Sequence, residues 1–348
     1  MRNIASVGLD LAKSVFQLHG VDERGRAVLR KTLKRSEVTS FFARLAPCLI
    51  GMEACGSAHF WARKLSELGH TVKLMAPQFV KPYVKSNKND ARDAEAICEA
   101  VSRPNMRFVP IKNIEQQALL AVHRVRQGFV SARTAQSNQI RGLLSEFGIV
   151  MPKGITSLER RMPEILADVE NGLPGTSREL FARLYAHFKE LSRQMGELEQ
   201  QIKAWHREST ASRRLEAIPG IGPLSASALV ASIGDARAFK SGRQLAAWLG
   251  LVPRQNSTGG KERLLGISKR GDTYLRTLLI HGARSVLLRL KRNSDQAEGW
   301  AARLVGRRNA NIAAVALANK NARIIWALLA HGREYQRGYV ASPLRVAV

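Results

Sequence analysis

The order of short strands and helices in the first hundred residues constrains the fold of this chain more than any other feature. Three runs enriched in Val, Leu and Phe, with the turn "DERG" between the second and third, predict a three-stranded antiparallel meander over residues 5–12, 15–22 and 26–34. Helix and strand patterns then alternate over residues 36–46, 48–54, 57–69, 70–77 and 90–102. The order β-β-β-α-β-α-β-α predicts a mixed sheet flanked by helices.

The rest of the chain has helical patterning. Residues 113–147 and 177–214 are rich in Gln, Ala, Arg, Glu and Leu, with apolar residues at helical spacing, and we expect a long-helix connector that also serves dimerisation. The segment "IPGIGPLSASAL" is typical of a helix-hairpin-helix element, although a Gly-Pro turn between two core helices has the same pattern. The predicted fold class is α/β plus all-α, with domains at 1–112, 113–214 and 215–348.

The net charge indicates the kind of partner. The 348 residues carry a formal charge of +27, which favours a long polyanion as ligand because its binding releases counterions. A ribosomal or chromatin-packing protein would share this charge, but an apolar content of 45% argues for more than neutralisation. Nucleic acid is therefore the expected partner, and a membrane-surface role is disfavoured because no amphipathic basic helix stands apart.

The sequence gives little support for a zinc-binding, disulfide-bonded, membrane-spanning or secreted protein. The three cysteines form no CxxC pair and the histidines show no HExxH spacing, which argues against zinc and disulfides. No run of about 18 apolar residues is evident and the first residues lack a signal-peptide pattern, so we expect a cytoplasmic protein.

Four carboxylates lie at the ends of predicted strands or in the first turn of a predicted helix. Asp10 ends the first strand and Glu53 the fourth, while Asp90 and Asp93 share one face of the last helix's first turn. In the expected sheet these ends meet, and hard oxygen ligands suit two Mg²⁺ or Mn²⁺ ions about 4 Å apart that assist phosphodiester displacement. Taken singly, each acid is more simply a turn former or a helix-dipole partner.

A second candidate site is the segment "RQNSTGGKER". Ser257 lies on a Gly-rich loop beside Arg254, Lys261 and Arg263, where its hydroxyl can approach a phosphate and the cations can stabilise developing charge. The alternative is a flexible basic turn that only grips phosphates. Lys269, Arg270 and Arg276 follow at helical spacings, as expected for either nucleic-acid contact or a solvated charged face.

Together these motifs resemble those of one family. "GLDLAK", "MEACG", "KNDARDAEAI", "IPGIGPLSASAL" and "GLVPRQNSTGGKERLLGISKRGDTYLR" cover nearly the whole chain, and the chain is similar to the DEDD transposases of the bacterial IS110 family, IS1111 subgroup. The resemblance implies a RuvC-like, ribonuclease H-like domain with Asp10, Glu53, Asp90 and Asp93 as catalytic metal ligands.

The resemblance also implies a mechanism and partners. Members of the family act as DNA recombinases guided by a structured noncoding bridge RNA and assemble as dimers that pair into tetramers. Their catalytic serine lies in the loop that holds Ser257 here and forms a phosphoserine linkage to DNA. We expect Ser257 as nucleophile, with Thr258 as the alternative, because a primary hydroxyl is less hindered. Ser257 of one protomer would meet the carboxylates of another.

Two other functions fit parts of the sequence. A RuvC-like junction-resolving nuclease would use the four carboxylates with water as nucleophile, which leaves the serine loop without chemistry. A non-catalytic nucleic-acid-binding scaffold would use only the charge. A covalent protein-DNA adduct distinguishes the recombinase from the first, and loss of cleavage on carboxylate substitution distinguishes an enzyme from the second.

Overall fold

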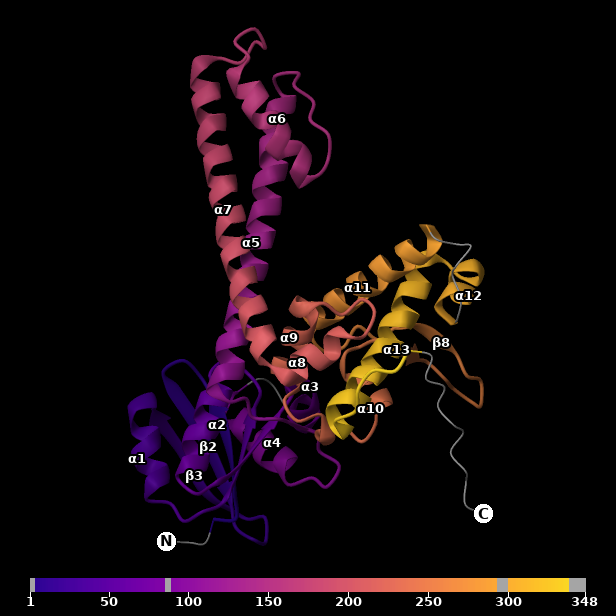
Figure 1. Cartoon of the computed structure of the whole chain (residues 1–348). Coiled ribbons are helices and arrows are strands. Elements are labelled where there is room, and N and C mark those ends of the chain that lie inside the picture. Colours follow the sequence, from indigo (N-terminus) through magenta and orange to yellow (C-terminus); the bar gives the residue numbers. More distant parts are fainter. Residues whose placement is uncertain (1–3, 85–88, 293–299, 338–348) are drawn as a thin grey trace. The chain divides into compact units, whose positions relative to one another are not determined.

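A computed structural model describes residues 4–84, 89–292 and 300–337 (Figure 1). The chain divides into two compact units, Met1–Gln116 and Gln117–Val348, and each is described by itself. The α/β plus all-α fold class is confirmed, with a mixed sheet followed by a mainly helical region. The division into three domains stays a prediction.

The first unit is built on a six-stranded sheet with the strand order β3-β2-β1-β4-β5-β6. The meander of the first three strands is antiparallel, β4 and β5 continue the sheet in parallel, and β6 closes it antiparallel to β5. The strands are β1 (Ser6–Leu11), β2 (Val15–Val21), β3 (Ala27–Lys34), β4 (Leu49–Glu53), β5 (Thr71–Met75) and β6 (Phe108–Val109). The two-residue β6 has no counterpart in the sequence-based expectation.

Helices cover both faces of this sheet. They are α1 (Val38–Ala43), α2 (Ala58–Glu67), α3 (Pro77–Val80) and α4 (Asp90–Val101). Val7 and Leu9 of β1 are fully buried in a cluster with Phe42 of α1 and Trp61 of α2. Because successive strand residues point to opposite faces, Gly8 between them faces the other side, where it lies against α4.

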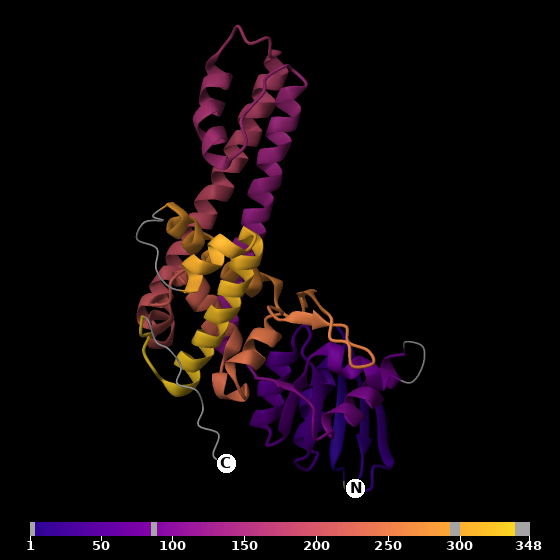
Figure 2. The same cartoon turned by 90° about the vertical axis from the view of Figure 1, so that its right-hand side faces the viewer.

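The second unit begins with a long helical hairpin. The helices α5 (Ile114–Ser145) and α7 (Gly175–Glu208) lie side by side in both views, with α6 (Ile155–Ala167) at their connected ends (Figures 1 and 2). A buried cluster that includes Leu144, Leu158, Phe181 and Phe188 joins the three helices there. The two long helices were predicted, whereas α6 has no counterpart in the sequence-based expectation.

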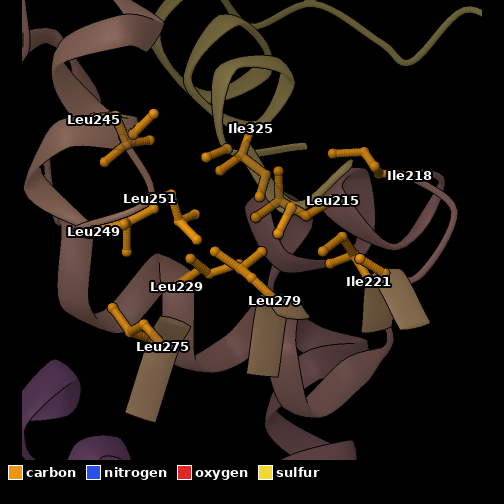
Figure 3. Packing of buried hydrophobic residues seen from close by; sticks show 14 of the residues in the cluster. Leu215, Ile218, Ile221, Leu229, Leu245, Leu249, Leu251, Leu275, Leu279 and Ile325 are labelled. Atoms are coloured by element: carbon orange, nitrogen blue, oxygen red, sulfur yellow. The ribbon is translucent and has the colours of Figure 1, made fainter. Parts of the chain in front are cut away.

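The remaining elements form a separate helical core. They are α8 (Thr210–Glu216), α9 (Pro223–Ile233), α10 (Gly242–Trp248), β7 (Pro253–Gln255), β8 (Leu264–Ile267), α11 (Thr273–Arg292), α12 (Trp300–Arg307) and α13 (Ala310–His331). Figure 3 shows Leu229 of α9, Leu279 of α11 and Ile325 of α13 converging in this core with Leu249, which directly follows α10. Among the described residues of this unit, β7 and β8 pair as a short antiparallel hairpin.

Within the described part of the chain, one helix reaches the length and hydropathy of a membrane span, contrary to the expectation from the sequence. It is α13, with a mean hydropathy of 1.3 in its most apolar window. Its Ala314, Ala318, Ala322 and Ile325 are fully buried in the core formed with α10 and α11. Packing inside the second unit therefore accounts for its apolar composition.

Candidate active site

Two glycines allow α4 to lie directly on the sheet. Gly8 and Gly51 are paired neighbours on β1 and β4. A Cβ atom at Gly8 would meet the carbonyl oxygen of Ala94 at 2.0 Å, and one at Gly51 would meet Cβ of Val101 at 2.7 Å. Any side chain at either position would push α4 away from the sheet, since packed cores accommodate added atoms poorly.

This close contact brings the carboxylates together. Asp10 and Glu53 each stand two residues after one of these glycines, so they emerge on the face that α4 covers. At the start of α4, the Asn89 side chain accepts a hydrogen bond from the backbone N–H of Ala91 at 3.0 Å and caps the helix. The first helical turn then presents Asp90 and Asp93 on one side.

Three of the four carboxylates form a tight group. One oxygen from each of Asp10, Asp90 and Asp93 lies within 4.8 Å of the others. Asp90 is exposed, while Asp10 and Asp93 are half-buried. Ligand oxygens about 2.1 Å from a single Mg²⁺ lie up to about 4.2 Å apart, so small side-chain rotations would allow this all-oxygen group to hold a divalent cation.

The fourth carboxylate, Glu53, interacts electrostatically with this group. Burial raises the pKa of its carboxyl group, and the negative charges of Asp10 and Asp93 raise it further. The site thus concentrates negative charge inside a chain of net charge +27. A divalent cation would offset that repulsion, which fits the residues present here.

The structure therefore brings together the four carboxylates that the sequence singled out, although their catalytic and metal-binding roles stay predictions. Two lysines just before α4, Lys85 and Lys88, lie outside the described residues. Lys88 is the first residue of the "KNDARDAEAI" motif.

The serine segment forms an exposed hairpin in the second unit. β7 and β8 pair around a loop in which Ser257 and Thr258 are both exposed. Gly259 and Gly260 have φ angles of 56° and 78°, and the N–H of Lys261 donates to the carbonyl of Thr258 at 3.0 Å. The two glycines thus close a tight turn, which requires positive φ at both central positions.

Ser257 is held just before that turn. Its Oγ accepts a hydrogen bond from the backbone N–H of Arg263 at 3.3 Å, which leaves the hydroxyl proton for donation. Arg254, Lys261 and Arg263 are all exposed around it. This arrangement presents a hydroxyl among cations, as a nucleophile for phosphate requires, although the assignment of Ser257 over Thr258 stays a prediction.

The base of the hairpin is far more constrained than its tip. A Cβ atom at Gly250 would meet the carbonyl oxygen of Arg270 at 2.0 Å, and one at Gly271 would meet that of Trp248 at 1.9 Å. The buried guanidinium of Arg276 donates to the carbonyls of Leu249 and Arg270, both at 3.2 Å. These contacts fix the two ends of the hairpin to each other.

Arg276 thus has a structural position that its sequence pattern did not reveal. The charge spacing placed it with Lys269 and Arg270, which are exposed, whereas its own side chain is buried. Contact of all these cations with nucleic acid stays a prediction. The glycines on either side of the hairpin were the available signal for a tightly packed base.

The glycine-rich turn between α8 and α9 packs against α11. A Cβ atom at Gly282 would meet the carbonyl oxygen of Gly220 at 1.9 Å, and Asn321 donates from Nδ2 to the carbonyl of Pro219 at 3.0 Å. Gly220 therefore serves close packing of the helix-hairpin-helix-like element, while Gly222 is exposed at the start of α9.

A buried polar network, which sequence reasoning missed, joins the helical hairpin to this core. The ring of His123 on α5 pairs with the Tyr274 hydroxyl at 3.0 Å and with Ser227 Oγ at 3.1 Å. Arg126 binds Glu199 of α7 nearby at 2.5 Å. Burial and, to a smaller extent, the charge of Arg126 together lower the pKa of His123 to about 4, so the ring is neutral at physiological pH.

Comparison with known proteins agrees with this geometry. A family model described as "Transposase IS116/IS110/IS902 family" matches residues 212–298, which include the serine hairpin. A transposase model of the IS110 DEDD type matches residues 7–149, which include the four carboxylates.

Several curated relatives match over all or nearly all of their length. A "Probable family 20 transposase" of Pseudomonas aeruginosa is 56% identical over 337 residues, covering 97% of this chain and 100% of the relative. The "Transposase for insertion sequence element IS1111A" of Coxiella burnetii is 46% identical, covering 97% and 93%. The corresponding IS1328 transposase of Yersinia enterocolitica is 45% identical, covering 97% and 100%. This chain therefore belongs to the IS110 family of insertion-sequence transposases, with the IS1111 subgroup among its relatives.

Proposed function

We propose that this transposase is an RNA-guided DNA recombinase that cleaves and rejoins DNA through a covalent phosphoserine intermediate. The observation that carries the proposal is the convergence of Asp10, Asp90 and Asp93 within 4.8 Å at one end of a sheet, in a strongly basic chain. The exposed Ser257 hydroxyl among cations supplies a nucleophile that the carboxylates lack.

In the proposed step, Ser257 Oγ attacks the scissile phosphorus and loses its proton to a base. The new Oγ–P bond forms as the P–O bond to the leaving deoxyribose breaks, and that oxygen takes up a proton. Bound Mg²⁺, held by Asp10, Glu53, Asp90 and Asp93, would polarise the phosphate and stabilise developing charge. Arg254, Lys261 and Arg263 orient the phosphate, and the serine ester conserves the energy of the broken bond for rejoining.

Target choice in this proposal rests on a structured noncoding bridge RNA. Base pairing reads the target and donor DNA, while the protein contributes charge and shape. Dimers that pair into tetramers hold the strands, and Ser257 of one protomer meets the carboxylates of another. The reaction takes place in the bacterial cytoplasm, on nucleoid DNA.

The adduct is the direct test of this proposal. Purified protein is incubated with Mg²⁺, the adjacent noncoding RNA and labelled DNA spanning the element junction, then resolved on a denaturing gel. We expect a DNA-shifted protein band that disappears without RNA, in Asp10→Ala and in Ser257→Ala, but persists in Thr258→Ala. Loss in Thr258→Ala alone would move the nucleophile by one residue. Cleaved DNA without any adduct would favour the water-using nuclease.

Mixing inactive variants tests the sharing of the site between protomers. In a mixed oligomer of Ser257→Ala and Asp10→Ala chains, one shared site keeps both an intact serine and intact carboxylates. We expect the mixture to recover adduct formation that neither variant has alone. No recovery, with mixed oligomers confirmed by differently tagged chains, would place both groups in the same protomer.

A further inference from the structure

A groove of ≈ 710 Å³ opens on the first unit, and its described lining includes none of the four carboxylates. The turn after β1, the end of β3 and the start of α2 border it. Its lining includes Lys13, Val15, Lys34, Arg35, Phe60 and Trp61, together with two serines. Phe60 and Trp61 of this lining belong to α2, on the face of the sheet opposite α4, whereas Asp10 lies on the face that α4 covers.

The charges of the groove favour an anion. Lys13, Lys34 and Arg35 contribute three cations, and no carboxylate is among the described residues that line it. The nearest acid along the chain, Glu37, accepts a hydrogen bond from the backbone N–H of Lys34 at 2.7 Å. Lysines on an edge strand such as β3 also discourage pairing with a strand of another chain. That role does not explain Lys13, which lies in a turn, or the aromatic side chains of the lining.

The aromatic groups give the groove a flat stacking surface. The Arg35 guanidinium lies over the rings of Trp61 and Phe16, at 5.3 Å and 5.7 Å from their centroids. Phe60 meets Trp61 edge to face at 5.2 Å, and 47% of Phe60 is exposed to solvent. An exposed phenylalanine beside a held guanidinium plane offers two surfaces on which a nucleobase stacks.

One buried donor of a groove residue has no hydrogen-bond partner among the described residues. Trp61 is only 4% exposed, and its indole Nε1 makes no hydrogen bond to any described residue. Buried indole N–H groups usually find an acceptor, since leaving one unpaired costs about 1–3 kcal/mol. Because this atom is itself buried, a ligand in the groove would reach it only after a shift of the surrounding side chains.

We propose that this groove binds one unpaired nucleotide of a nucleic-acid strand. The base stacks on Phe60 and the Arg35 plane, and the 5′-phosphate lies between Lys13 and Lys34. This inference deepens the proposed function and rests on it only for nucleic acid as the ligand class. It gives the catalytic unit a strand-holding site whose lining is separate from the four carboxylates.

Fluorine NMR of the full chain labelled with 5-fluorotryptophan tests this site without any DNA cleavage. The Trp61 signal is assigned from its loss in Trp61→Phe. Titration with uridine or adenosine 5′-monophosphate is expected to shift that signal saturably. Inorganic phosphate alone and uridine alone are expected to bind at least about tenfold more weakly, because each makes only half of the contacts.

Substitutions in the groove complete the test. Phe60→Ala and Arg35→Ala should each weaken mononucleotide binding about fivefold or more, as loss of about 1 kcal/mol of stacking requires, while Phe60→Tyr should retain it. Arg30→Ala, an exposed cation on β3 outside the groove, is the matched control and should have no effect.

An unmoved Trp61 signal would overturn the proposal, as would equal binding of inorganic phosphate, which would indicate an anion site only. Equal weakening by Arg30→Ala would also overturn it. The saturable shift is independent of the serine adduct, so failure of the recombination proposal and failure of the groove are separate results.

Discussion

Gly8 of β1 lies so close to Ala94 of α4 that a Cβ atom at Gly8 would stand 2.0 Å from the Ala94 carbonyl oxygen. Ala94 directly follows Asp93 on the helix, and Asp10 is two residues from Gly8 on the strand. The packing of a glycine against a helix backbone therefore sets the separation of two carboxylates in the candidate metal site.

Gly8→Ala is expected to destabilise the first unit because the added methyl group forces α4 from the sheet. Overpacking of this kind costs typically about 1–3 kcal/mol. Urea unfolding measures the change, with Gly56→Ala as control, since no atom lies within 4 Å of a Cβ at Gly56. Equal stability of the two variants would show that α4 does not depend on this contact.

Glu53→Gln is expected to stabilise the metal-free protein at neutral pH. The folded-state pKa of Glu53 is raised, first by burial and then by Asp10 and Asp93, so ionisation is easier in the unfolded chain. Stability linked to this group therefore falls as pH rises through the ordinary glutamate pKa toward the raised one. Unfolding at pH 7 with a chelator measures this, and the exposed Glu23→Gln should change little.

Added Mg²⁺ should reduce the stability advantage of Glu53→Gln over the wild type. We expect it to raise the melting temperature of the wild type more than that of Glu53→Gln, because the ion offsets a repulsion that the amide has already removed. An equal Mg²⁺ increment in both proteins would place the ion away from Glu53.

Arg276→Ala is expected to destabilise the second unit by about 1–3 kcal/mol for each carbonyl left unpaired. Its buried guanidinium donates to Leu249 and Arg270, which flank the serine hairpin. Urea unfolding compares it with Arg289→Ala, an exposed arginine on the same helix. If both variants unfold alike, the buried guanidinium does not hold the hairpin base.

His123→Gln should remove a pH dependence of stability. The folded-state pKa of about 4 lies below the ordinary value of 6.5, so the stability linked to the neutral ring is present above pH 6.5 and is lost as pH falls toward 4. Between pH 7.5 and pH 5 the wild type should lose about 2 kcal/mol through this group. The glutamine variant should lack that loss, whereas His281→Gln, at an exposed position, should keep it.

Local patterning in the sequence predicted most of the elements. The alternation of apolar residues identified the first five strands, and the helical spacing in α5 and α7 identified both long helices. It missed β6, which consists of only Phe108 and Val109 and pairs with residues more than thirty positions earlier. It also missed α6, which lies between the two predicted long helices and carries Pro163 in its interior.

The sequence by itself determined the element order, the basic charge and the positions of the four carboxylates, because these depend on residue type and local spacing. Only the tertiary structure showed that Gly8 and Gly51 admit α4 to the sheet, that Arg276 is buried, and that Phe60, Trp61 and Arg35 line one groove. Such contacts join residues distant in the chain, and close packing, unlike helical or strand periodicity, leaves no regular pattern along it.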